Sequence, residues 1–250
     1  MTHIFSLRSE IRITGFLLFV LFMTGCSSVQ PRWTVRTSST PFSSSSDLAS
    51  LEQETVALFT PLAPVPILRG DEAVLGLYLA ESIKRIAPAW KMIDEQQTIG
   101  LINRHGLTDE YTRLRQGADQ SHILERALLQ KIGKGIGVRY VFQPRLAYIS
   151  QTMTDRLEAP VAPFLILQTR SAVMRLSLQL WDCESGEPIW SSVAESVVLN
   201  ETASLEPMFI KDAARAAFSS MLTDLLTRKT SSKYTRLDRF LDNLIHEQNE

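Results

Sequence analysis

The order of apolar and polar positions between residues 54 and 227 predicts one α/β domain. Two short apolar runs, residues 55–59 and 90–93, are typical of buried strands, and prolines or polar turns bound them. Between and after these runs, apolar residues recur at the spacing of helices with one buried face. The predicted helices begin at Asp71, Asp94, Thr108 and Ser121, and the one from Thr108 is polar and expected to be exposed. We therefore expect strands and helices to alternate through the first half of the domain.

The second half shows the pattern of a half-buried antiparallel hairpin. A third strand is predicted at residues 138–149, and apolar residues then occupy every second position from Met174 to Leu180. A turn leads into residues 189–199, and a long helix with one apolar stripe follows at residues 205–226. The sequence therefore predicts a single mixed sheet of about five strands with helices packed on it, a C-terminal β-hairpin and a long final helix.

The segments around these elements are predicted to be irregular. Residues 26–53 are rich in Ser and Thr and lack an apolar period, so we expect a disordered tether. Residues 150–169 contain two prolines and are expected to form a loop or flap. Residues 228–236 form a basic linker in this prediction.

A short amphipathic helix is predicted after the linker, at residues 237–246. Three roles are open for this helix: it packs back on the domain, it docks a partner or it touches a membrane. Asp238 and Asp242 disfavour the membrane, because an anionic membrane surface repels them. The flap and this helix are the two candidate binding surfaces. The apolar stripe of the helix at residues 237–246 consists of Leu237, Phe240, Leu241, Leu244 and Ile245.

The N-terminal residues have the organisation of a secretory signal. Residues 1–12 carry Arg8 and Arg12, and residues 13–23 are an apolar run about half as long as the ~20 residues that a membrane-crossing helix needs. We therefore predict a signal peptide at residues 1–25. The alternative is an N-terminal membrane anchor that is never cut.

Thr24, Gly25 and Cys26 follow this run, and the order resembles the signal of bacterial lipoproteins. The resemblance implies that the Cys26 thiol is acylated and that the chain is cut between Gly25 and Cys26. In such lipoproteins an Asp directly after the cysteine tends to retain the protein in the inner membrane. This chain has Ser27 at that position. This implies the outer membrane of a Gram-negative bacterium, with the domain facing the periplasm. A secretory signal with a chance cysteine is the alternative.

Composition and motifs give no support for an enzyme, a cofactor or a nucleic-acid partner. The formal charge after signal removal is about −2, and the histidines lie at scattered positions without metal-ligand spacing. We therefore predict no catalytic, cofactor-binding or metal-binding residues. If Cys26 is acylated, Cys183 has no cysteine partner in the chain. Cys183 is then a tolerated turn residue, or a thiol that reacts with another molecule.

Two short motifs resemble one bacterial lipoprotein superfamily. They are Ile-Gly-Lys-Gly-Ile-Gly-Val-Arg-Tyr-Val at residues 132–141, and Leu-Ser-Leu-Gln-Leu-Trp-Asp at residues 176–182 followed by Gly-Glu-Pro-Ile-Trp at residues 186–190. The superfamily includes the curli secretion lipoprotein, the penicillin-binding-protein activator lipoprotein B and the N-terminal domain of TolB. The resemblance covers about residues 54–226 and implies an α/β domain that works in the cell envelope.

Two functions are compatible with these features. The first is a non-catalytic binding or regulatory module, held at the membrane by lipidated Cys26 and engaging an envelope protein of unknown identity. The second is a subunit of an oligomeric secretion channel of the curli type. A channel would require lipid-facing hairpins with strands of ~9 to 11 residues. The sequence leaves the oligomeric state open.

Overall fold

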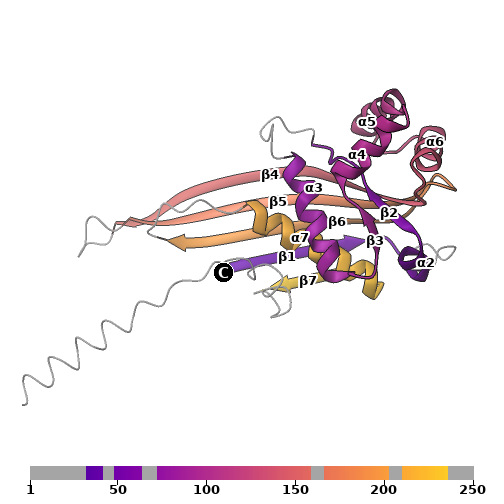
Figure 1. Cartoon of the computed structure of the whole chain (residues 1–250). Coiled ribbons are helices and arrows are strands. Elements are labelled where there is room, and N and C mark those ends of the chain that lie inside the picture. The colour runs from indigo at the N-terminus through magenta and orange to yellow at the C-terminus, as the bar shows by residue number, and fades with distance from the viewer. Residues whose placement is uncertain (1–31, 42–47, 64–71, 159–165, 203–209, 236–250) are drawn as a thin grey trace, which may run out of the picture. The chain divides into compact units, whose positions relative to one another are not determined.

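The structure, a computed structural model, describes residues 32–41, 48–63, 72–158, 166–202 and 210–235. Figure 1 shows one sheet with helices packed on it, which confirms the predicted α/β class. The strands are β1 Arg32–Ser39, β2 Thr55–Leu58, β3 Lys91–Ile93, β4 Tyr140–Glu158, β5 Ile166–Asp182, β6 Glu187–Thr202 and β7 Ser231–Thr235. The described helices are α2 Leu48–Gln53, α3 Glu72–Ile86, α4 Glu95–Arg104, α5 Thr108–Ser121, α6 Arg126–Ile136 and α7 Ile210–Thr227.

The sheet has seven strands in the order β3-β2-β4-β5-β6-β1-β7, two more than the five or so expected. Strand β2 pairs in parallel with both β3 and β4. From β4 to β7 every pairing is antiparallel. The predicted C-terminal hairpin is confirmed as β5 and β6, and the predicted long helix follows as α7.

Alternation along the strands divides the apolar side chains between the two faces of the sheet. Val56 and Leu58 of β2 belong to one buried cluster, to which α3 and α7 contribute. Ala57, between them, belongs to a second cluster with side chains of α4, α5 and α6. The predicted alternation of β5 is confirmed, because Met174 and Leu176 are buried on the α7 side.

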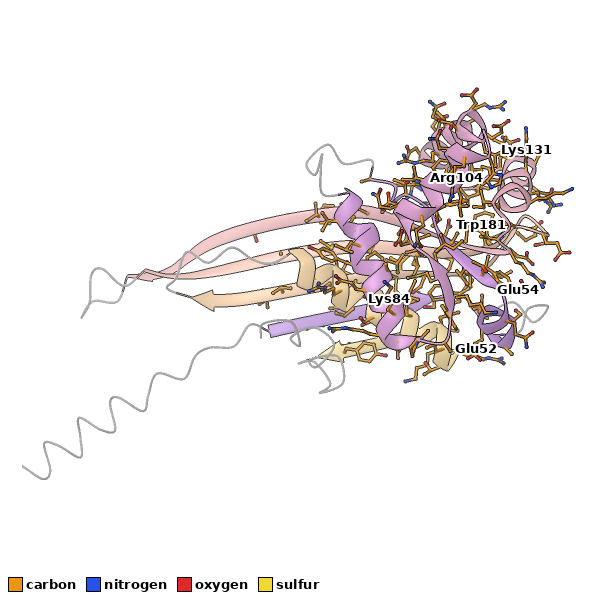
Figure 2. The ribbon with its side chains drawn as sticks, in the orientation of Figure 1. Glu52, Glu54, Lys84, Arg104, Lys131 and Trp181 are labelled. Atoms are coloured by element: carbon orange, nitrogen blue, oxygen red, sulfur yellow. The ribbon has the colours of Figure 1, made fainter. Side chains whose placement is uncertain are left out.

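Two helix ends follow the expected local chemistry. Asp94 caps α4, and its side chain accepts a hydrogen bond from the Gln97 backbone N–H at 2.9 Å. Gly137 ends α6 with a φ of 71°, a conformation that glycine adopts without strain. Helix α5 differs from expectation, since it buries Tyr111 and Leu114 against the sheet. Lys131 of α6, labelled in Figure 2, donates to Glu110 of α5 at 2.6 Å.

The predicted tether is wrong for two parts of its length. Residues 32–39 form β1, which pairs with β6 on one side and β7 on the other, and residues 48–53 form α2. Val35 of β1 is buried in the core, and the Thr37 hydroxyl donates to the buried carboxylate of Asp224 in α7. The domain therefore begins at residue 32 rather than at residue 54.

The predicted flap at residues 150–169 is also wrong outside its tip. Strands β4 and β5 pair from Tyr140 opposite Asp182 to Glu158 opposite Ile166, with register shifts between Leu146 and Tyr148 and between Asp155 and Leu157. The two prolines that suggested a loop are Pro160 and Pro163, and they lie outside the described residues. Figure 1 shows β4, β5 and β6 running well beyond the helices.

The basic linker is partly a strand. Residues 231–235 form β7, which pairs with β1 at the edge of the sheet. The Ser232 hydroxyl donates to Asp224 at 2.7 Å, so this segment is tied to the core. The predicted helix at residues 237–246 lies outside the described residues.

Candidate functional site

The predicted lipid-attachment and cleavage positions, Cys26 and Gly25, lie outside the described residues. The start of β1 nevertheless limits how far Cys26 can be from the domain. Residues 27–31 separate Cys26 from Arg32, and a chain of that length spans at most about 20 Å.

Cys183 lies in the turn between β5 and β6, as predicted, and its side chain is buried. Its side chain is 3% exposed and packs beside Gly133 of α6. Burial, with a smaller contribution from the charge of Asp182, raises the pKa of the Cys183 thiol to about 12. The thiol is therefore protonated at neutral pH and supplies no thiolate.

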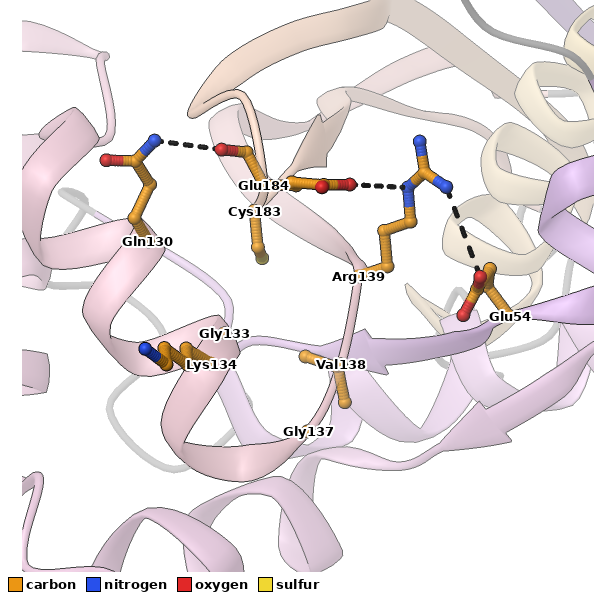
Figure 3. A pocket seen from close by; sticks show the side chains of 9 residues that line it. All are labelled: Glu54, Gln130, Gly133, Lys134, Gly137, Val138, Arg139, Cys183 and Glu184. Atoms are coloured by element: carbon orange, nitrogen blue, oxygen red, sulfur yellow. Dashed lines mark hydrogen bonds and ion pairs between the residues drawn. The ribbon is translucent and has the colours of Figure 1, made fainter.

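A surface pocket of about 500 Å³ lies where α6, the start of β4 and the β5–β6 turn meet (Figure 3). Arg139 lies there among three carboxylates, at 3.7 Å from Glu184, 3.8 Å from Asp182 and 4.0 Å from Glu54. Its guanidinium also lies 5.2 Å from the ring centroid of Tyr140. The carboxylates balance the charge of Arg139 within the fold.

Gln130 closes the same corner by donating to the backbone carbonyl of Glu184 at 2.8 Å, as Figure 3 shows. The hydrogen bond of Gln130 therefore joins α6 to the β5–β6 turn, and the ion pair of Arg139 with Glu184 joins the start of β4 to the same turn. Within the described ranges, no three His, Cys, Asp or Glu side chains are arranged to hold a metal ion.

A larger polar surface lies on the side of the sheet opposite α7. One cross-strand row on that side runs from β4 to β7 and contains Tyr148, Arg175, Glu195, Arg36 and Lys233. Arg175 and Glu195 form an ion pair at 2.5 Å. Side chains on this side of β6 and β1 are half-buried or exposed, so the described helices leave it uncovered. We call this row, together with Val193 and Leu199, the open face.

The open face combines exposed apolar and basic side chains. Tyr148, Val193 and Leu199 are between 40% and 47% exposed. The row holds three cations and one carboxylate, and that carboxylate is paired with Arg175. Among the described residues, Arg36 and Lys233 have no carboxylate within 4.0 Å. The open face therefore carries net positive charge and also exposes apolar side chains.

Sequence reasoning did not identify this surface. Its signal was present in β5, where Val173, Arg175, Ser177 and Gln179 alternate with the buried leucines. The contributions of Arg36 and Lys233 required β1 and β7, which were assigned to a tether and a linker. Of the two predicted binding surfaces, the flap at residues 150–169 is mostly strand. The helix at residues 237–246 lies outside the described residues.

In the part of the chain that the structure describes, no helix is long and apolar enough to cross a membrane.

Comparison with known proteins finds no matching family model and no matching curated protein. Solved structures that resemble the chain include the PelC dodecamer from Paraburkholderia phytofirmans, 12% identical, covering 77% of this chain and 96% of that chain with a TM-score of 0.40. Lipoprotein GNA1162 from Neisseria meningitidis is 11% identical, with 70% and 96% coverage and a TM-score of 0.40. A PDZ domain protein from Parabacteroides distasonis is 10% identical, with 85% and 40% coverage and a TM-score of 0.36. The neighbours thus include a bacterial lipoprotein, and likenesses of this size establish no family.

Proposed function

We propose that this protein is an outer-membrane lipoprotein whose periplasmic domain is a non-catalytic binding module in cell-envelope assembly. The observation that carries the binding role is the open face. An antiparallel sheet that is packed on one side offers its other side to solvent or to a partner. Here that side presents partly exposed apolar residues next to Arg36 and Lys233, which have no ion-pair partner among the described residues.

The charges on the open face indicate the chemistry of the partner. Arg36, Arg175 and Lys233 outnumber Glu195, and the chain as a whole carries a formal charge of −1, so the basic character is local. Opposite charges across an interface steer association and exclude other partners. The proposed partner is therefore a protein with an acidic surface.

The anchor is the second part of the proposal. The signal at residues 1–25 and the acylated Cys26 are supported by the order of charged, apolar and small residues before the cysteine. Three acyl chains would hold the protein firmly, at ~0.8 kcal/mol per buried CH₂ group. The short connection of residues 27–31 would then keep the domain beside the membrane.

Site-specific photo-crosslinking in intact cells tests the binding role. A photoreactive amino acid at Val193 or Leu199, both on the open face, should give a crosslinked product with another envelope protein. The same amino acid at Leu77 of α3, which is 54% exposed on another surface, is the matched control and should not. Reversing two charges with Arg36→Glu and Lys233→Glu should reduce the yield roughly tenfold.

Three outcomes would contradict the binding role. They are equal yields from Leu77 and Val193, an unchanged yield after charge reversal, and products that contain only copies of this chain.

A secretion-channel subunit is the second candidate, and the length of the β4–β5 hairpin favours it. The strands have 19 and 17 residues, enough for a hairpin of the required length. The outer part of the hairpin, however, contains Asp155, Arg156, Glu158 and Arg170, which are costly in contact with lipid. The purified protein distinguishes the candidates: a large ring that requires detergent after Cys26→Ser replacement would favour the channel, and a soluble monomer or small oligomer the module.

A further inference from the structure

A second, smaller cavity lies at the margin of the open face. It has a volume of about 50 Å³ and lies between the C-terminal end of α5 and strands β4 and β5. Arg145, Gln143, Ser177, Gln179 and His122 supply its polar lining. In the sheet register Arg145 lies opposite Ser177, and Ser177 lies opposite Val193 of the open face.

Arg145 is a buried cation without a carboxylate partner in the described part of the chain. It is 8% exposed, and no carboxylate there lies within 4.0 Å of its guanidinium. Its Nη2 donates to the carbonyl of Ala118, in the last turn of α5, at 2.6 Å. Burial lowers the pKa of Arg145, and the charge of Asp119 opposes that shift. Because buried charges are normally paired, the guanidinium lacks an expected counterion.

Gln143 provides the second observation. It is 3% exposed, and its Nε2 donates to the carbonyls of Thr60 and Pro144, both at 3.0 Å. Two carbonyl acceptors fix which end of the amide is nitrogen, so the other end is oxygen. That Oε1 is buried and has no hydrogen-bond partner among the described residues. Gln143, with one polar atom that lacks a partner, thus lines the same cavity as Arg145, which forms no ion pair among the described residues.

The size of the cavity limits what can occupy it. A space of about 50 Å³ holds a few waters or one small polar group. A carboxylate matches the planar fork of a guanidinium and can accept two of its N–H groups. Water does not reach Gln143 Oε1, so Arg145 is the group that recognises a ligand in this cavity.

We propose that this cavity, the Arg145 pocket, binds a carboxylate group, supplied by an Asp or Glu side chain of the partner. The pocket lies at the edge of the open face, so a partner that covers Val193 can place one acidic side chain in it. The assignment of this carboxylate to a partner protein rests on the proposed function. The preference for a carboxylate rests on Arg145 alone and is tested on the purified protein.

The test measures the melting temperature of the purified full chain at constant ionic strength, with acetyl-aspartate-amide as the probe. The neutral analogue acetyl-asparagine-amide is the matched control. We expect the aspartate probe, in about tenfold excess over its Kd, to raise the Tm by roughly 3 °C, and the asparagine analogue to leave it unchanged. The Arg145→Met variant should lose the rise, whereas Arg104→Ala, which removes an exposed arginine of α4, should keep it.

A second pair of variants keeps the proposal testable if Arg145→Met fails to fold. Ser177→Asp places a carboxylate inside the pocket, opposite Arg145, and should raise the Tm of the free protein and remove the response to the probe. Ser177→Asn, of the same size and neutral, should do neither.

Four results would overturn the proposal: no rise with the aspartate probe, an equal rise with the asparagine analogue, a rise with inorganic phosphate but not with the carboxylate, or a full response in the Arg145→Met or Ser177→Asp protein. If the pocket binds the probe but crosslinking from the open face fails, the pocket stands and the proposed partner does not. The opposite result would remove the pocket and leave the docking surface.

Discussion

At the scale of single residues, Gly133 shows why a helix of this domain contains a glycine. It lies within α6, and a Cβ atom at this position would lie 2.3 Å from the Cβ of Cys183 and 3.1 Å from the carbonyl of Val138. The absent side chain lets the helix pack directly against the β5–β6 turn. The glycine at this position is therefore required by close packing, and Cys183 is the residue that it accommodates.

Replacing Gly133 with alanine should destabilise the protein by about 1 to 3 kcal/mol, because backbone and a buried side chain would have to move. Gly100→Ala in α4 is the matched control, since nothing lies within 4 Å of its added Cβ. It should stabilise by about 0.5 to 1 kcal/mol through helix propensity. Urea unfolding of both variants measures the difference, and equal effects would refute the packing role of Gly133.

The thiol of Cys183 should be inert in the folded protein and should weaken the fold at high pH. Its pKa rises from 9.0 to about 12 on folding, so between these values the unfolded chain ionises first and stability falls as pH increases. In a Cys26→Ser background, iodoacetamide at about pH 8 should label Cys183 only after unfolding, because the folded thiol stays protonated and covered. Above about pH 9, stability should decline more steeply than in Cys183→Ala. Rapid labelling of the native protein would contradict the buried position.

At the scale of elements, the sequence was informative where apolar periodicity was strong. The strands and helices of the first half, the alternation of β5 and the cap at Asp94 were all predictable. Strand β1 was not, because two of its inward positions are Thr37 and Ser39 rather than apolar residues. They are satisfied inside the fold by Asp224 and by the hydroxyl of Ser192 at 2.8 Å, partners that are distant in sequence.

The role of β1 predicts the effect of truncation. A chain that begins at Ser46 lacks β1, exposes the edge of β6 and removes Val35 from the core. We expect it to aggregate or to unfold at lower urea concentration than a chain that begins at Ser27. Size-exclusion chromatography and urea unfolding of the two chains provide the measurement. Equal stability would mean that residues 32–39 are a tether after all.

At the scale of the whole molecule, the proposed sites depend on pairings that no local pattern reports. Cys26 could be predicted as the lipid-attachment site from the sequence because such a signal is short and contiguous. The open face unites residues of five strands, and the Arg145 pocket unites α5 with β4 and β5. Arg36 and Lys233 are neighbours only because β1 and β7 pair. Their joint role could not be read from the separate segments in which they occur.

We propose that this domain works beside a membrane, attached through Cys26. The most direct test is the intact mass of the protein extracted from membranes of the cells that make it, with Cys26→Ala as the variant and Cys183→Ala as the control. In the wild type and in Cys183→Ala, we predict a chain that begins at Cys26 and carries three acyl chains. The Cys26→Ala variant should give no acylated chain. A mature protein that retains residues 1–25, or that begins elsewhere with an unmodified terminus, would contradict the account.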